Sequence, residues 1–293
     1  MSDEFIIRHE NPELTQPYMI IGLSGWVNAG EVPSSVLVYL ISRFQATLFA
    51  EFEPNEFYCY QTTGSEAKRP IVNIENGVVK SVNTVSTSFW YHKSRIGGHD
   101  LILVSGPEPD QKWNMYSDLM IKIAQEFQVV KIISLGGIFD AVPHTAPSRL
   151  TAVVSHTELK EEAQSYGLEL ISYQGPSSVH SLIMIKASEA NIPMLSIFAH
   201  TPHYIQVTNF IACYNIMAKI DEMLGINIDL EVARKDSEYL RAQIDNAIEQ
   251  KPELQEYLKT LEAEYRQGKP EIQQSVNKNI IKEIEDLLKK GQD

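Results

Sequence analysis

The sequence predicts an α/β protein, with a mostly parallel sheet covered by helices on both faces and followed by a helical C-terminal region. Up to about Gly225, short apolar runs recur, and a Gly- or Pro-containing loop and a segment with helical spacing follow most of them. Strands that alternate with helices in this way are typical of parallel sheets covered on both faces. Beyond Gly225 the composition shifts to Glu, Lys, Gln, Leu and Ile without strand-like runs. We therefore expect an α/β domain over residues 1–225 and a helical region over residues 226–293.

The first strand–loop–helix unit consists of the apolar run Tyr18–Leu23, a Gly-rich turn and a helix over residues 33–44, where Pro33 suits a helix start. Later units repeat the pattern. We expect further strands near residues 101–105, 129–135 and 193–199, and further helices over residues 112–127 and 205–224.

Residues 47–93 differ in composition, since they are rich in Val, Ile, Thr, Tyr and Phe. Asn76 and Gly77 stand between two alternating runs, which is the strongest short signal for a β-hairpin. We expect an antiparallel insertion there. Residues 140–174 carry a Pro-rich loop, a strand and a helix.

The C-terminal region carries three amphipathic stripes, separated by Pro252 and by the break at residues 268–270. Short isolated helices are marginal in water, so these stripes must pack on the α/β body, on each other or on a partner. We expect a separable appendage, with core cover as an equal alternative. The stripes consist of Leu230, Ala233, Leu240, Ile244 and Ala247; Leu254, Tyr257, Leu258, Leu261 and Tyr265; and Ile280, Ile284, Leu287 and Leu288.

Composition and charge exclude several classes of function. The formal net charge of -13 would repel nucleic acid and anionic lipid, and no basic patch offsets it. Cys59 and Cys213 are far apart, outside the spacings used by zinc or redox sites, so we expect two buried thiols and a reducing compartment. The N-terminus lacks a signal-peptide pattern, and no apolar run is long enough to span a bilayer. We expect a cytoplasmic protein without a metal or cofactor.

Polar residues gather in four loops that follow predicted strands: residues 22–30, 105–110, 136–145 and 200–204. If the strands are parallel, these loops share the carboxyl edge of the sheet, where α/β proteins bind ligands. We expect a single cleft there, suited to acid/base work or to a small polar ligand. The candidate pocket residues are Gly22, Ser24, Trp26, Asn28, Glu31, Ser105, Glu108, Asp110, Gly136, Gly137, Asp140, His144, His200 and His203.

Each glycine-rich loop has two interpretations. Gly22, Gly25 and Gly30 suggest a phosphate cradle, yet the spacing fits neither phosphate motif and Trp26 occupies the turn, which favours a tight strand-to-helix turn. Backbone amides at residues 136–137 would suit an anion, although a Gly pair more often permits a turn.

The candidate acid/base groups are equally open. Asp140 would orient His144 for acid/base catalysis, or both would brace the Pro-rich loop. His200 and His203 lack the spacing of two zinc ligands on one helix face.

Glu108 and Asp110 are expected to cap the following helix. Ser24 lacks the context of a nucleophile elbow, so no nucleophile is indicated.

Four segments in this order resemble the proteasome assembly chaperone 2 (PAC2) family of bacterial type. They are GLSGWVNAG at 22–30, LVSGPEPDQKW at 103–113, LGGIFDAVPHT at 135–145 and FAHTPHY at 198–204, with AKRP at 67–70 as a weaker fifth. The resemblance covers about residues 18–224, and the acidic helical tail is also similar to that of bacterial members.

The resemblance implies a three-layer α/β/α sandwich similar to purine nucleoside phosphorylase, and homo-oligomers, with a trimer favoured. It implies no activity. Eukaryotic relatives help to build the proteasome core ring, and those that dock on it tend to end in a hydrophobic residue, Tyr and any residue. This chain ends Gly291-Gln292-Asp293, which departs from that pattern.

Two classes of function follow. The first is a non-enzymatic, oligomeric assembly chaperone or scaffold, with a possible protein partner at the C-terminal helices. The alternative is an enzyme or small-ligand binder for a nucleoside-like or carboxylate-amine substrate at the carboxyl-edge loops. We also expect the aromatic segments at residues 44–60 and 88–91 to be exposed and to drive oligomer formation.

Overall fold

The computed structural model describes residues 3–61, 68–94 and 98–267. Its main sheet has nine strands in the order β1-β3-β6-β7-β2-β8-β11-β9-β10, and β4 and β5 form a separate hairpin. The strands are β1 (Ile6–Arg8), β2 (Tyr18–Ser24), β3 (Thr47–Phe52), β4 (Ile71–Glu75), β5 (Val78–Asn83), β6 (Ser88–His92), β7 (Leu101–Pro107), β8 (Lys131–Asp140), β9 (Leu150–Val154), β10 (Glu169–Leu170) and β11 (Met194–Pro202).

The helices follow the strands in the expected alternation. They are α1 (Val32–Phe44), α2 (Pro54–Phe57), α3 (Trp113–Glu126), α4 (Leu159–Ser165), α5 (Val179–Glu189), α6 (Phe210–Leu224), α7 (Glu231–Glu249) and α8 (Pro252–Arg266), with short 3-10 turns η1 (Asp3–Phe5) and η2 (Ala29–Glu31).

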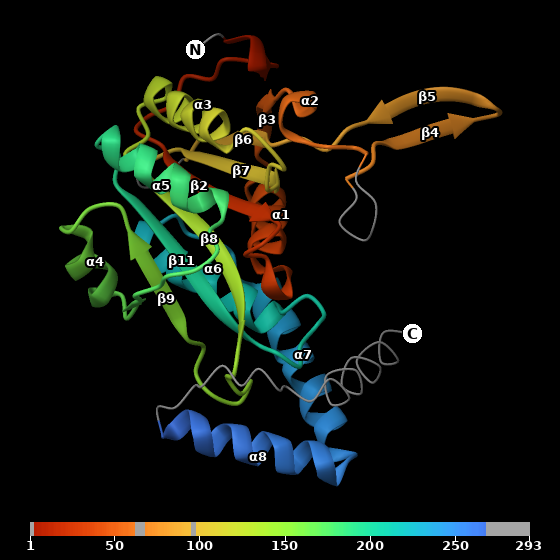
Figure 1. Ribbon diagram of the computed structural model, residues 1–293, viewed down its shortest axis with the longest axis vertical. Coiled ribbons are helices and arrows are strands. Elements are labelled where there is room, and N and C mark those ends of the chain that lie inside the picture. Colours follow the sequence, from red (N-terminus) through yellow and green to blue (C-terminus); the bar gives the residue numbers. More distant parts are fainter. Residues whose placement is uncertain (1–2, 62–67, 95–97, 268–293) are drawn as a thin grey trace.

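The centre of the sheet is parallel and its flanks are mixed. β7, β2, β8 and β11 run parallel to their neighbours in this group. On one flank β1, β3, β6 and β7 pair antiparallel, and on the other β9 is antiparallel to β11 and parallel to β10. Helices cover both faces of this sheet (Figure 1). The predicted α/β fold with a mostly parallel, mixed sheet is therefore confirmed.

Alternating residues of each central strand feed two separate cores. Met19, Ile21 and Leu23 of β2 pack into the core beneath α3 and α5, whereas Ile20 packs into the core beneath α1 and α6. Gly22 lies on the same face as Ile20, where a Cβ would come within 2.1 Å of the Leu37 side chain. Helix α1 therefore lies directly on the end of β2.

The aromatic residues around β3 and β6 lie inside the protein. Phe49, Phe52, Phe57 and Phe89 are fully buried in the core beneath α3 and α5, and their rings make edge-on or tilted contacts with one another. The expectation that these segments are exposed is wrong, because β3 and β6 join the main sheet and one of its helical layers covers them. Of the two thiols, Cys213 is buried and Cys59 is half-buried.

A group of exposed aliphatic side chains lies on the hairpin instead: Ile71, Val72, Ile74, Val78, Val79 and Val82. β4 and β5 project from the body as a two-stranded arm (Figure 1). The turn uses Asn76 and Gly77, both with positive φ, as the primed hairpin turns require.

Helices α7 and α8 pack on the α/β body through a third apolar cluster. Leu240 and Ile244 of α7, with Leu254 and Leu261 of α8, contact Tyr204 and its neighbours after β11. The first two predicted stripes thus supply buried contacts, and the third, at residues 280–288, lies outside the described residues.

Candidate functional site

The four predicted loops do follow the carboxyl ends of parallel strands, but their side chains divide into separate groups. The clusters lie at the ends of β8 and β11, at the contact with α7, and at the ends of β2 and β7. Each has its own bonding partners, which decide what it can do.

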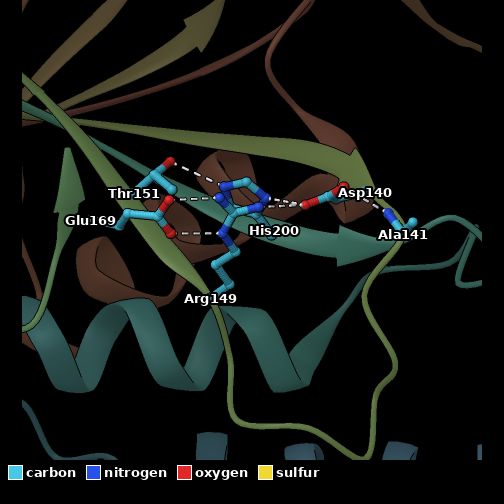
Figure 2. Close-up of polar contacts among 6 residues, drawn as sticks. All are labelled: Asp140, Ala141, Arg149, Thr151, Glu169 and His200. Carbon is cyan, nitrogen blue, oxygen red and sulfur yellow. Dashed lines mark hydrogen bonds and ion pairs between the residues drawn. The ribbon is translucent and has the colours of Figure 1, made fainter. Parts of the chain in front are cut away.

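Asp140 and His200 form the centre of the first cluster. The carboxylate of Asp140 lies 2.6 Å from Nδ1 of His200, and Nε2 of that ring lies 3.1 Å from Oγ1 of Thr151 on β9 (Figure 2). A carboxylate can only accept, so Nδ1 carries the proton, and in the neutral ring Nε2 accepts the Thr151 hydroxyl proton. The order of groups is carboxylate, imidazole and hydroxyl.

Arg149 ties this cluster to the edge of the sheet. Its guanidinium donates to Asp140 at 3.1 Å and makes a two-pronged contact with Glu169 of β10 at 2.8 and 2.9 Å. Burial acts to raise the pKa of Asp140, but the hydrogen bond and charge of His200, the Ala141 amide and Arg149 outweigh it, and the pKa is lowered. Asp140 is therefore held as a carboxylate.

The same order of groups activates nucleophiles in hydrolases, but access decides its role here. Thr151 is fully buried, and Asp140 and His200 are each below one-tenth exposed. The cavity beside His200 and Arg149 has a volume of about 20 Å³, room for a water molecule and no substrate. In this structure the cluster fastens β8, β9, β10 and β11 together.

His144 belongs to a different cluster, at the contact with α7. Its Nε2 lies 3.0 Å from the Asp245 carboxylate and its Nδ1 lies 2.7 Å from the Tyr204 hydroxyl, which also accepts from the His144 amide. Arg241 donates to the His144 carbonyl. Burial lowers the pKa of His144 although Asp245 favours the charged form. The alternative in which Asp140 orients His144 is wrong: each has another partner, and His144 connects the body to α7.

Glu108 caps a helix, but not the one that follows it. Its two carboxylate oxygens accept from the amides of Trp26 at 3.0 Å and of Val179, the first residue of α5, at 2.7 Å. The following helix, α3, begins after Lys112, where no side chain caps it. Asp110 accepts from the Cys59 amide and pairs with Lys68 at 2.7 Å. The expectation that both cap the following helix is therefore wrong.

The third group surrounds an open cleft of about 650 Å³ at the ends of β2 and β7. We call it the β2–β7 cleft. Four of the predicted residues line it: Gly22, Ser24, Asn28 and Ser105.

The remaining candidates lie outside these groups. The Trp26 side chain is 69% exposed. Glu31 accepts from Thr208 at 2.5 Å, and His203 is half-buried beside the ring of Phe139.

The Gly pair lies in β8 rather than in an open turn. A Cβ on Gly137 would come within 2.3 Å of the Ala29 carbonyl, and one on Gly136 would meet the Phe198 ring. These glycines permit close packing of the strand against neighbouring chain.

Several residues in these groups were not predicted. Arg149, Thr151 and Glu169 complete the first cluster, and Lys68 and Arg69 line the cleft. Only Lys68 and Arg69 had a signal, since they fall in the weak fifth motif. Within the described ranges, no group of three or more His, Cys, Asp or Glu side chains is placed to hold a metal ion, and no described helix has the length and apolar character needed to cross a bilayer.

The fold defines a layered α/β protein. At the carboxyl edge of its sheet, the polar side chains mostly bond to one another. The sequence matches the profile of the PAC2 family over residues 22–248, and the chain belongs to that family. No protein of curated function matches the sequence.

Solved structures share the fold. A PAC2 family protein from Streptomyces avermitilis is 26% identical with a TM-score of 0.72, covering 82% of this chain and 99% of that chain. A proteasome-assembly chaperone homologue from Mycobacterium tuberculosis is 22% identical with a TM-score of 0.73 and the same coverage. An archaeal proteasome activator from Pyrococcus furiosus is 21% identical with a TM-score of 0.64, covering 82% and 97%.

Proposed function

We propose that this protein is an oligomeric assembly chaperone or scaffold that acts through protein–protein contact rather than catalysis. Membership of the PAC2 family supports this, as do structural relatives described as a proteasome-assembly chaperone homologue and a proteasome activator. The observation that carries the proposal is the exposed apolar face of the β4–β5 hairpin.

The register of the hairpin gathers four of its six large aliphatic side chains on one face. Residues paired directly across an antiparallel ladder lie on the same face. Val72 pairs with Val82 and Ile74 pairs with Val79, while the irregularity at Lys80 keeps these two pairs in phase. The opposite face carries the pairs Ile71–Asn83, Asn73–Ser81 and Glu75–Val78.

This face exposes a group of neighbouring aliphatic side chains to solvent. Its four side chains are 48–58% exposed, and a lone two-stranded hairpin is marginally stable in water. Covering each side chain would contribute on the order of 1 kcal/mol. Burial of this face against a protein partner would therefore stabilise both the complex and the hairpin.

A second copy of this chain is the partner we favour for the arm, in a cytoplasmic homo-oligomer that we expect to be a trimer. A client protein would then bind elsewhere, and the C-terminal helices offer a surface. On α7, Tyr239 is largely exposed beside Phe210, and the two residues line a hollow of about 310 Å³.

Site-specific photo-cross-linking in cells tests the proposal. A photoreactive residue at Val79, on the apolar face, should give covalent protein adducts of discrete mass, and one at Asn73, on the opposite face, should give far fewer. Mass spectrometry of the adducts distinguishes a second copy from another protein. Equal labelling from the two positions, or none from Val79, would contradict the role of this face.

A further inference from the structure

The β2–β7 cleft has the lining of a binding site, and it is separate from the hairpin face. Its floor is formed by the ends of the two central strands. In β2 and β7, Ser24 and Ser105 alternate with residues of the core beneath α3 and α5, so both side chains point to the α1 side of the sheet. One wall is α1, through Ser34 and Val38, and another is the chain that leads into the hairpin, through Lys68 and Arg69.

The cleft has an unusual charge for this protein. Among the described residues, two basic residues and no acidic residue line it, in a chain with 38 acidic and 25 basic residues. Two carboxylates near the cleft are already engaged: Asp110 binds Lys68, and both oxygens of Glu108 accept backbone amides. The Arg69 side chain is exposed, and its guanidinium makes no hydrogen bond or ion pair with the described residues.

Hydrogen-bond donors are also left over. The Asn28 carbonyl oxygen accepts from Ser34, which leaves the amide nitrogen free to donate. The hydroxyls of Ser24 and Ser105 bond to no other described residue. Lys68 donates to the Glu108 carbonyl and to Asp110, and a third ammonium proton remains.

We propose that the β2–β7 cleft binds a small organic anion, with its phosphate or carboxylate group held by Arg69 and by donors from Ser24, Asn28 and Ser105. A guanidinium fork matches the oxygens of either group. The side chains of Val38 and Val85 would contact the carbon skeleton of the ligand. The volume of about 650 Å³ is that of sites for compounds of nucleotide size.

Thermal unfolding and calorimetric titration with the full-length protein test the proposal. The probes are ribose 5-phosphate, citrate and uncharged ribose. At least one of the two anions should raise the unfolding temperature saturably and bind more weakly as salt rises, and ribose should do neither. The choice between ribose 5-phosphate and citrate separates a phosphate from a carboxylate ligand. Failure of both anions, or binding only at tens of millimolar, would overturn the proposal.

Two variants locate the binding. Arg69→Gln should weaken the bound anion by about tenfold or more, because it removes a charged donor, and Arg266→Gln on α8 is the matched control. Val38 is exposed on α1, so Val38→Asp should fold and repel the anion, while the neutral Val38→Asn should bind as the wild type does. Wild-type affinity in Arg69→Gln or Val38→Asp would overturn the proposal.

Discussion

Val72 lies directly opposite Val82 on the projecting hairpin, and the pair Ile74 and Val79 extends the same face. Each of these side chains is about half exposed, so no described part of the chain buries them. The protein therefore carries an apolar contact surface on an arm, away from its two cores. That position suits contact with another protein.

Removing the Asp140 charge should destabilise the protein. Asp140→Asn keeps the shape but weakens the bonds from His200 and Arg149 inside a buried cluster. We expect the free energy of unfolding at pH 7 to fall by about 1–3 kcal/mol, measured by urea denaturation. The control is Glu169→Gln, at the exposed end of the cluster, which should cost less than about 1 kcal/mol. Equal losses in the two variants would contradict the buried anchoring role.

The effect of Asp140 should also depend on pH. Its pKa is lower in the folded protein than in the unfolded chain, so its stabilising contribution is present above about pH 4 and is lost as the pH falls through the folded pKa. The difference between wild type and Asp140→Asn should therefore shrink below pH 4. A constant difference down to pH 2 would show that the charge is not the cause.

His180 on α5 should make the protein sensitive to mild acid. The ring is fully buried and neither nitrogen has a partner within the described residues. Burial lowers its pKa to about 4. Between pH 6.5 and pH 4 the unfolded chain binds a proton that the native protein does not, so stability falls as pH falls.

The variant His180→Leu tests this. From pH 7.5 to pH 5 the His180 contribution should cost the wild type about 2 kcal/mol in the free energy of unfolding, and His180→Leu should lose that much less. The control is Met184→Leu, a volume-conserving change of a buried residue on the same helix that removes no titratable group and should keep the wild-type dependence. If His180→Leu has the same acid sensitivity as the wild type, another group is responsible.

A chain ending at Gly225 should fold but lose stability. The sheet strands all precede Gly225, whereas truncation uncovers Tyr204 and Ile211 and removes the contacts of Asp245 and Arg241 with the His144 loop. We expect cooperative unfolding at a lower temperature and increased binding of an apolar dye. Absence of a cooperative transition would mean that α7 and α8 are part of the domain core.

The fold could be predicted from the sequence because its signals are local. Apolar runs gave the central strands, Pro33 marked the start of α1, and Asn76-Gly77 marked the hairpin turn. The burial of the aromatic residues in β3 and β6 was not predicted, since burial depends on which strands pair across the sheet and which helices cover it.

The candidate groups could be predicted only in part for the same reason. The motifs placed Asp140 and His200 at one edge and include Tyr204, but they do not show that Tyr204 bonds to His144. Asp245, Arg149 and Glu169 lie outside every motif. The apolar face of the hairpin depends on the irregular register at Lys80, which alternation alone does not reveal.

The molar mass in solution, measured by light scattering during gel filtration across micromolar concentrations, tests the central claim most directly. We predict a mass of three times the 33.1 kDa chain. Val82→Asp, which charges the apolar face, should reduce it to that of one chain, and Ser81→Asp on the opposite face should leave it unchanged. A wild-type mass of 33.1 kDa at every concentration, or an unchanged oligomer in Val82→Asp, would contradict the account.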